Sequence, residues 1–180
     1  MIRSAGSPGA FLRPLPYSPQ ANPLISNPPI RSILVLCEAN HCRAPIAEGL
    51  LRAALGPSIR VTSAGLNALV DAPPDPEAER LMRDQGHDIS AHRGRQFTPE
   101  MAHGADLILV MDSPQKEWCT QLAPSARGRV FLLGHWLSTP PHEIADPFCL
   151  GQVAFRRVFE DIHHSVSAWA PHLISEQRLA

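Results

Sequence analysis

Short apolar runs alternate along the chain with longer segments of helical period. Three of the runs, 32–37 (SILVLC), 106–111 (DLILVM) and 130–133 (VFLL), are rich in Val, Ile and Leu and lack regular polar alternation. This pattern is typical of strands that are covered on both faces. The shorter run 60–63 (RVTS) is a further strand candidate. We therefore expect a sheet of four strands.

The segments between these runs carry helix signals. Pro45 in the first turn and Gly56 after the last turn delimit one helix. Ser113 is the expected N-cap of another helix, with Pro114 at its first position. The helices are predicted at 45–55, at 74–86, from Ser113 onward and at 151–169.

Strands that alternate with helices predict an α/β fold with a parallel sheet. In open sheets of this kind, ligands bind beyond the carboxyl ends of the strands. The loop that follows 32–37 is therefore the first place to look for a site.

The first 31 residues differ in composition from the rest. They hold seven of the nineteen prolines and no acidic residue. Such a segment can bury little apolar surface. We expect residues 1–31 to be a disordered Pro-rich extension, and residues 32–180 to form one folded domain.

Charge and cysteine content exclude several classes of function. Because 16 basic residues stand against 17 acidic ones, we expect no nucleic-acid binding. No apolar run approaches the roughly 20 residues of a bilayer crossing, so we expect no membrane insertion. The cysteines, Cys37, Cys42, Cys119 and Cys149, form no CxxC pair, which argues against a zinc site. We expect a reduced, cytoplasmic protein without a metal or cofactor.

The loop after the first strand is a Cys-x5-Arg sequence, from Cys37 to Arg43. Five intervening residues can curl so that their backbone N–H groups point inward and hold an anion. The following helix adds its N-terminal N–H groups, and Arg43 adds a fork that matches phosphate oxygens. The positive surroundings predict a lowered pKa for the Cys37 thiol, which is then placed to attack phosphorus. Phosphate-binding positions predicted in this loop are Glu38, Ala39, Asn40, His41, Cys42 and Ala44.

A cysteine nucleophile needs an acid to protonate the leaving group. Asp146 follows the fourth strand, at the same edge of the sheet as the Cys-x5-Arg loop. Pro147 restricts the backbone next to it. Asp146 is therefore the predicted general acid.

These motifs, together with Thr62-Ser63-Ala64-Gly65 and His92-Arg93-x-Arg95-Gln96, resemble the low-molecular-weight protein tyrosine phosphatases. The runs 106–111 and 132–136 are most similar to the bacterial exopolysaccharide-cluster branch. The resemblance implies a flavodoxin-like, three-layer fold with a four-stranded parallel sheet. It also implies metal-free hydrolysis of phosphotyrosine through a phosphocysteine, with Cys37 as nucleophile, Arg43 binding phosphate and Asp146 as acid and then base.

The resemblance carries further expectations. Asn40 matches a residue that shapes the phosphate loop, with His92 as its expected partner. Phe148 stands where relatives often have tyrosine and would be an aromatic wall for the substrate. Cys37 and Cys42 would form a reversible disulfide. The implied partner is a phosphotyrosine protein, namely a membrane tyrosine kinase of exopolysaccharide export.

Two positions depart from the family pattern. Ala44 replaces a Ser or Thr whose hydroxyl would donate to the cysteine thiolate, so we expect a slower enzyme. Ala39 replaces a glycine, which strains the loop only if its φ is positive.

Two alternatives remain open at this point. An arsenate reductase-like enzyme would use the same Cys-x5-Arg loop, but it needs resolving cysteines, and Cys119 and Cys149 have no suggestive spacing. We interpret Cys119 and Cys149 as structural residues. A weakened phosphatase would act as a phosphotyrosine- or anion-binding module.

Overall fold

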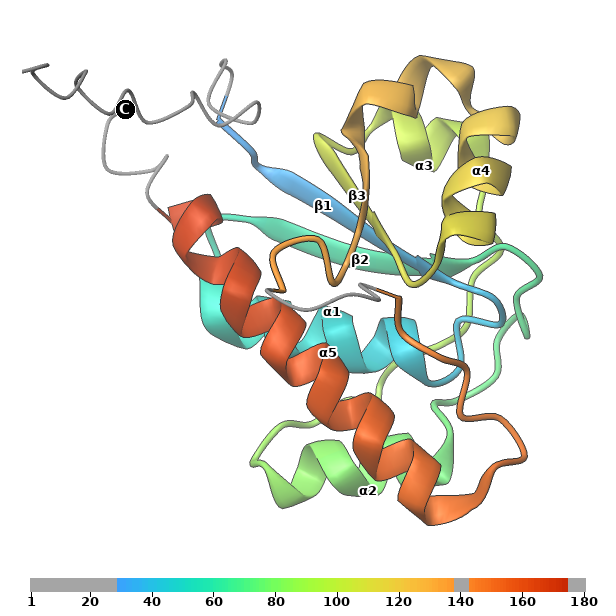
Figure 1. The fold of residues 1–180 in the computed structure, drawn as a ribbon, viewed down its shortest axis with the longest axis vertical. Helices are drawn as coiled ribbons and strands as arrows, with labels where there is room; N and C mark the ends of the chain where they lie inside the picture. The colour runs from blue at the N-terminus through green and yellow to red at the C-terminus, as the bar shows by residue number, and fades with distance from the viewer. Residues whose placement is uncertain (1–28, 138–142, 175–180) are drawn as a thin grey trace, which may run out of the picture.

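The computed structural model describes residues 29–137 and 143–174. Its centre is a four-stranded parallel sheet in the order β2-β1-β3-β4 (Figure 1). The strands are β1 (Ser32–Cys37), β2 (Arg60–Gly65), β3 (Leu107–Val110) and β4 (Val130–Leu132). The predicted strands are confirmed, and the carboxyl ends of all four lie at one edge of the sheet.

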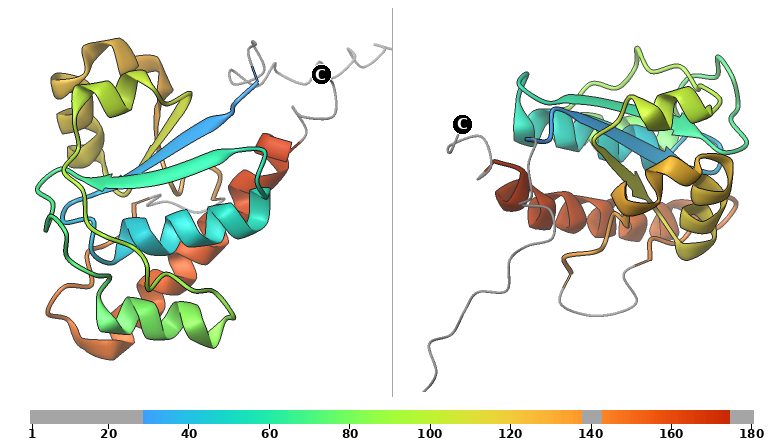
Figure 2. Two further views of the ribbon diagram at one scale, coloured as in Figure 1. Left: turned by 180° about the vertical axis from the view of Figure 1, so that it is seen from behind. Right: turned by 90° about the horizontal axis from the view of Figure 1, so that it is seen from above.

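Helices cover both faces of this sheet. The long helices α1 (Arg43–Leu55) and α5 (Gly151–Ile174) pack together on one face, with α2 (Pro76–Asp84) against them. The other face carries α3 (Pro99–His103), α4 (Ser113–Leu122) and the 3-10 helix η1 (Pro124–Arg129) (Figure 2). The predicted three-layer, flavodoxin-like α/β fold is confirmed.

The lack of polar alternation in β1 follows from this arrangement. Ile33, Val35 and Cys37 point into the core beneath α1 and α5. Leu34 and Leu36 point into the core beneath α3 and α4. Because successive strand residues face opposite sides, a strand between two helical layers must be apolar throughout. Cys37 therefore leaves the sheet on the α1 side.

Several local predictions need correction. The short helices α3 and η1 were not expected from the pattern. Asp112, not Ser113, caps α4: its side chain accepts the N–H of Gln115, and Ser113 is the first helical residue. The last helix runs on to Ile174 rather than ending near 169.

The start of the ordered body differs from the predicted boundary at residue 32. Ile30 is buried in the core, and the N–H of Arg31 donates to Asp106. The prediction of disorder was made for residues 1–31, and residues 1–28 of that range lie outside the described residues. Within the described residues, no helix combines the length and the apolar character needed to span a bilayer.

Candidate active site

A cavity of about 260 Å³ opens at the carboxyl end of β1. It brings together the Cys-x5-Arg loop and the segment after β4, which the sequence had placed at the same sheet edge. Its lining includes Cys37, Glu38, Ala39, His41, Cys42, Arg43, Asp146 and Phe148. Three other predicted residues, Asn40, Ala44 and His92, are not among those that line it.

Cys37 is the last residue of β1, and only 2 % of its surface is exposed. The backbone N–H groups of Ala44 and Asn40 donate to its sulfur. Burial raises the pKa of the Cys37 thiol, and this outweighs the lowering by Arg43 and by the two N–H groups. The prediction of a lowered thiol pKa is therefore wrong for this arrangement.

Arg43, which lowers the pKa of Cys37, is itself bound to several acceptors. Its side chain is 3 % exposed and forms an ion pair with Asp146. It also donates to the carbonyl of Ile144 at 3.1 Å, and Asp112 lies at 3.7 Å. Its Nε has no hydrogen-bond partner within the described residues. The guanidinium is thus held in the floor of the cavity with a donor still available.

Asp146 lies at the mouth of the cavity with 44 % of its side chain exposed. One carboxylate oxygen pairs with Arg43, and the other accepts the N–H of Phe148 at 3.0 Å. Phe148 is 69 % exposed and forms an apolar edge of the cavity. The expected proximity of Asp146 to the phosphate loop is confirmed.

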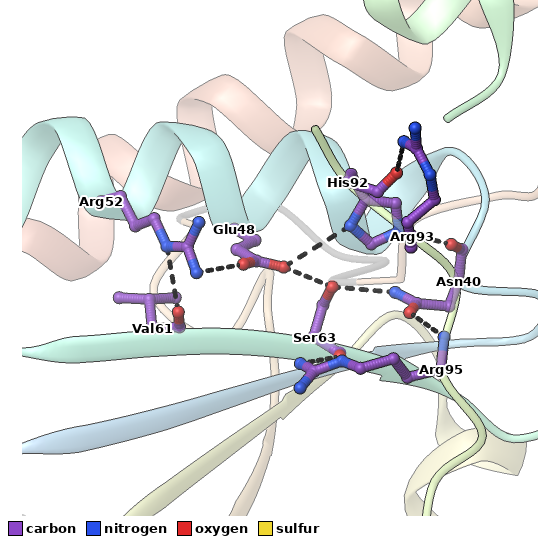
Figure 3. A network of polar contacts seen from close by, with 8 residues as sticks. All are labelled: Asn40, Glu48, Arg52, Val61, Ser63, His92, Arg93 and Arg95. Carbon is purple, nitrogen blue, oxygen red and sulfur yellow. Dashed lines mark hydrogen bonds and ion pairs between the residues drawn. The ribbon is translucent and has the colours of Figure 1, made fainter. Parts of the chain in front are cut away.

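Asn40 shapes the loop from behind. It is fully buried and has a left-handed backbone, with φ at 53°. Its amide nitrogen donates to Ser63 Oγ at 2.8 Å, and its Oδ1 accepts the N–H of Arg95 at 2.9 Å (Figure 3). These two bonds hold a residue in a conformation that costs free energy for a non-glycine side chain.

His92 contacts the backbone of Asn40 rather than its side chain. The Nε2 atom of His92 lies 2.9 Å from the carbonyl oxygen of Asn40. Because a carbonyl only accepts, Nε2 carries the hydrogen. Burial lowers the pKa of His92, and this outweighs the raising effects of the bond to Asn40 and of Glu48.

The support continues through a buried carboxylate that sequence reasoning missed. Ser63 donates to Glu48, and Arg52 forms an ion pair with Glu48 at 2.6 Å. Glu48 is 8 % exposed and lies one turn into α1, on the side of β2. A polar residue within the apolar run of this helix was the only available signal.

Gly65, in the Thr-Ser-Ala-Gly motif, has a steric role. A Cβ at this position would lie 2.8–2.9 Å from backbone atoms of Glu38, Ala39 and Asn40. Only glycine lets the end of β2 approach the phosphate loop this closely. Ala39 is not among the positive-φ residues of the described chain, so replacement of the family's glycine there causes no left-handed strain.

Two polar side chains of the cavity lining are held by contacts with neighbouring segments. Glu38 accepts from Asn67 at 2.6 Å. His41 contacts the carbonyl of Pro73 at 2.9 Å, and Asp75 lies 3.8 Å from its ring. Acidic side chains thus surround the opening.

The two remaining cysteines lie in different environments. Cys119 is buried in the core on the opposite face of the sheet from Cys37, as expected for a structural residue. Cys149 is exposed, so its interpretation as structural was wrong. This placement of Cys119 gives no route for a thiol relay from Cys37.

Within the described residues, no cluster of His, Cys, Asp and Glu could hold a metal ion. What the cavity offers instead is a thiol at its floor, a buried guanidinium beside it and a carboxyl group at its mouth. These three groups are of the chemical kinds that could attack, bind and protonate a phosphate ester.

Comparison with known proteins agrees with this chemistry. The profile of the family described as "Low molecular weight phosphotyrosine protein phosphatase" matches residues 32–179. The probable low molecular weight protein-tyrosine-phosphatase EpsP of Ralstonia nicotianae is 43 % identical over 144 residues, which is 80 % of this chain and 97 % of EpsP. The corresponding phosphatase Etp of Escherichia coli K12 is 42 % identical over 142 residues, covering 79 % of this chain and 94 % of Etp.

Solved structures give the same result. The tyrosine phosphatase Wzb of Escherichia coli K30, crystallised in complex with sulphate, superposes with a TM-score of 0.76 at 42 % identity. The match covers 80 % of this chain and 99 % of Wzb. The chain belongs to the low molecular weight phosphotyrosine protein phosphatase family and is a protein-tyrosine-phosphatase.

Proposed function

We propose that the chain hydrolyses protein phosphotyrosine through a phosphocysteine, with Cys37, Arg43 and Asp146 as its catalytic residues. The observation that carries this assignment is the meeting of the three side chains at one cavity, although Asp146 lies 103 positions after Arg43. The inward N–H groups at Cys37 and the buried Arg43 support a site for a tetrahedral oxyanion.

The proposed reaction has two steps. The Cys37 thiolate attacks phosphorus and forms an S–P bond, while the P–O bond to the tyrosine breaks and Asp146 gives its proton to the leaving phenolate. Asp146, now a carboxylate, then takes a proton from water. The water oxygen attacks phosphorus and the S–P bond breaks, while Arg43 holds the phosphate oxygens. Free phosphate then leaves the site.

The substrate must release Asp146 from Arg43 before this chemistry begins. A phosphate group offers two oxygens to the guanidinium, which matches its planar fork better than a single carboxylate oxygen does. Once it is released, the Asp146 carboxyl group can turn to the leaving oxygen of the substrate. Substrate binding thereby frees the proposed acid for its role.

Exposed apolar side chains border the opening and suit an aromatic ring. Leu69 is 50 % exposed and Phe148 is 69 % exposed, and both line the cavity. A phenyl ring between them would bury apolar surface on both of its faces. The proposed physiological substrate is the phosphorylated tail of a membrane tyrosine kinase of exopolysaccharide export, met in the cytoplasm.

One observation favours a second candidate, an anion-binding module with little turnover. Burial raises the pKa of Cys37, and Ala44 supplies only its backbone N–H where a hydroxyl would add a second donor. Such a protein would bind phosphate tightly and release product slowly.

Release of p-nitrophenol from p-nitrophenyl phosphate tests the two candidates. The reduced protein should turn over in the presence of a chelator, and Cys37→Ser should abolish turnover. Cys149→Ser is the matched control, since it removes an exposed thiol and should leave the rate unchanged. Phosphate binding without Cys37-dependent turnover would contradict the enzyme and favour the binding module.

A further inference from the structure

One carboxylate in the lining of the active-site cavity has no cationic partner. Glu38 directly follows Cys37 in the chain and lines the cavity. The ion pairs of the described residues do not include Glu38. Among those residues its side chain is hydrogen-bonded to the neutral amide of Asn67, at 2.6 Å. The negative charge of Glu38 is therefore uncompensated within the described part of the chain.

The other acidic residues of this lining have their charges engaged. Asp146 forms the ion pair with Arg43. Asp75 caps α2, because its side chain accepts the N–H of Glu77 at 2.8 Å. The positive end of a helix stabilises a carboxylate in that position. Glu38 is thus the acidic residue of the lining whose charge is left for a ligand.

The position of Glu38 is fixed by the segment that follows β2. The N–H of Asn67 donates to the carbonyl of Glu38 at 2.9 Å, and the N–H of Leu66 donates to the carbonyl of Cys37 at 3.0 Å. The side-chain amide of Asn67, an exposed residue, holds the carboxylate itself. The carboxylate of Glu38 is therefore held at the solvent-exposed end of the cavity, in one place.

An uncompensated carboxylate is unfavourable beside a site for an anion. The phosphate group of the proposed substrate is negatively charged, and like charges repel. The charges that shift the pKa of the Cys37 thiol are those of Arg43 and Asp146, so we place the effect of Glu38 on the substrate and not on the nucleophile. Glu38 weakens the binding of a phosphate ester unless the ligand brings a cation to match it.

The size of the cavity determines which part of a substrate can supply that cation. Its volume of about 260 Å³ is below the range of about 300–1,000 Å³ that is usual for whole small-molecule ligands. It can hold one aromatic phosphate side chain but not the backbone of a peptide. The residues next to the phosphotyrosine must therefore stay at the mouth of the cavity, where the carboxylate of Glu38 is held.

We propose that Glu38 selects phosphotyrosine segments that carry Lys or Arg next to the phosphotyrosine, by forming an ion pair with that side chain. The pair compensates the one charge of the lining that the protein leaves unmatched, and complementary charges of this kind give specificity. The proposal rests on the proposed function, because it names the class of phosphotyrosine sequence that the same site takes.

Binding of matched phosphopeptides to the full chain carrying Cys37→Ser tests this selection. The peptides hold one phosphotyrosine among alanines, with Lys, Ala or Glu placed directly before or directly after it, and fluorescence anisotropy gives each Kd. At one of the two positions at least, the Lys peptide should bind about two- to fivefold more tightly than the Ala peptide, as for a solvent-exposed ion pair. The Glu peptide should bind most weakly.

Variants of Glu38 in the same Cys37→Ser chain assign the preference to this residue. Glu38→Gln keeps an acceptor for Asn67 and should bind all the peptides equally. Glu38→Lys should reverse the order, so that the Glu peptide binds most tightly. Glu160→Gln, which removes an exposed carboxylate of α5, is the matched control and should keep the original order. If Glu38→Lys does not fold, the comparison with Glu38→Gln decides alone.

Two results would overturn the proposal. Equal affinities in the chain with Glu38 intact would show that the carboxylate does not read the neighbouring residue. A preference for Lys that survives in Glu38→Gln would assign it to another group. The preference should also shrink as the ionic strength rises from about 0.01 M to about 1 M, because the Debye length falls from about 30 Å to about 3 Å.

Kinetics separate this selection from the proposed function. With Cys37 intact, kcat/KM for the peptides should follow the order Lys, Ala, Glu. The KM for p-nitrophenyl phosphate, an anion that carries no cation, should fall in Glu38→Gln. Absence of Cys37-dependent turnover with every substrate would refute the proposed function, and the affinities measured in the Cys37→Ser chain would still decide the role of Glu38.

Discussion

The guanidinium of Arg43 forms an ion pair with the carboxylate of Asp146 across the mouth of the active site. The proposed phosphate-binding residue and the proposed acid therefore neutralise each other until a ligand separates them. Because the Asp146 charge raises the pKa of the Cys37 thiol, changes at Asp146 should affect Cys37 directly.

Asp146→Asn should lower the pKa of the Cys37 thiol, because the Asp146 charge raises that pKa in the intact site. The rate of alkylation by iodoacetamide, followed against pH, should therefore rise at a lower pH in the variant. Glu160→Gln, at an exposed position of α5, is the control and should not shift the profile. An unchanged profile in Asp146→Asn would show that the carboxylate has no influence on the thiol.

Asp146→Ala should lower kcat by about 10²–10⁴-fold, the usual contribution of a positioned acid. The loss should be greater with phenyl phosphate than with p-nitrophenyl phosphate, because p-nitrophenolate leaves readily without a proton. Steady-state rates with the two esters measure this difference. An equal loss with both would argue that Asp146 positions the substrate and does not protonate it.

Ala44→Ser should increase the chemical step by about 10–100-fold. The new hydroxyl can donate to the thiolate, and a hydrogen bond to a charged group contributes about 1.5–3 kcal/mol. The pKa of Cys37 should fall at the same time. Ala53→Ser, at an exposed position of the same helix, is the control. If Ala44→Ser changes neither the rate nor the pKa, the missing hydroxyl does not limit this enzyme.

His92 should make stability depend on pH. Burial lowers its pKa below the ordinary 6.5, so between the folded and unfolded pKa values the unfolded chain binds more protons. The free energy of unfolding should be fully retained above about pH 6.5 and should decrease on acidification, by at most about 1.4 kcal/mol per pH unit. Urea unfolding should show a shallower decrease for His92→Gln. If the free energy of unfolding decreases with pH equally in both proteins, His92 does not contribute to the pH dependence of stability.

Oxidation should join Cys37 to Cys42, but slowly at neutral pH. Burial raises the pKa of Cys42 to about 12, and the attacking species is the thiolate. The rate of disulfide formation after mild peroxide treatment should therefore increase with pH. Peptide mapping detects the Cys37–Cys42 disulfide. After the same peroxide treatment, a reductant should restore the activity of the unmodified protein but not that of Cys42→Ser. Full recovery in that variant would mean that Cys42 does not protect the nucleophile.

The parts of the site that were predictable are local in sequence or lie at strand ends. Cys37 and Arg43 fall within one loop, and Asp146 follows a strand whose carboxyl end reaches the same sheet edge. The contributions of Asp112 and Glu48 were not predictable, because each depends on which side chain faces it across the tertiary structure. The prediction of a lowered pKa for the Cys37 thiol was wrong because burial of the thiol outweighs the effect of Arg43, and the packing that buries it is not displayed in the sequence.

The fold was likewise predictable where its signal is local and strong, and was not predictable elsewhere. Buried strands such as 106–111 were recognisable from their uninterrupted apolar character. The five-residue helix α3 and the 3-10 helix η1 are too short to develop a helical period. Asp112 was passed over as a cap because Ser113 next to it has an equally suitable side chain. Both residue types suit an N-cap, and the hydrogen bond from the N–H of Gln115 to the side chain of Asp112 identifies Asp112 as the cap.

The bonds around Asn40 also bear on the order in which the protein folds. Its left-handed backbone is held by Ser63 on β2 and by His92 and Arg95 beyond α2, segments that lie far from it along the chain. The phosphate loop therefore takes its working shape only after those segments have docked. A chain that has paired β1 with α1 alone would hold Cys37 and Arg43 without a catalytic loop, so recovered activity should mark the last stage of refolding.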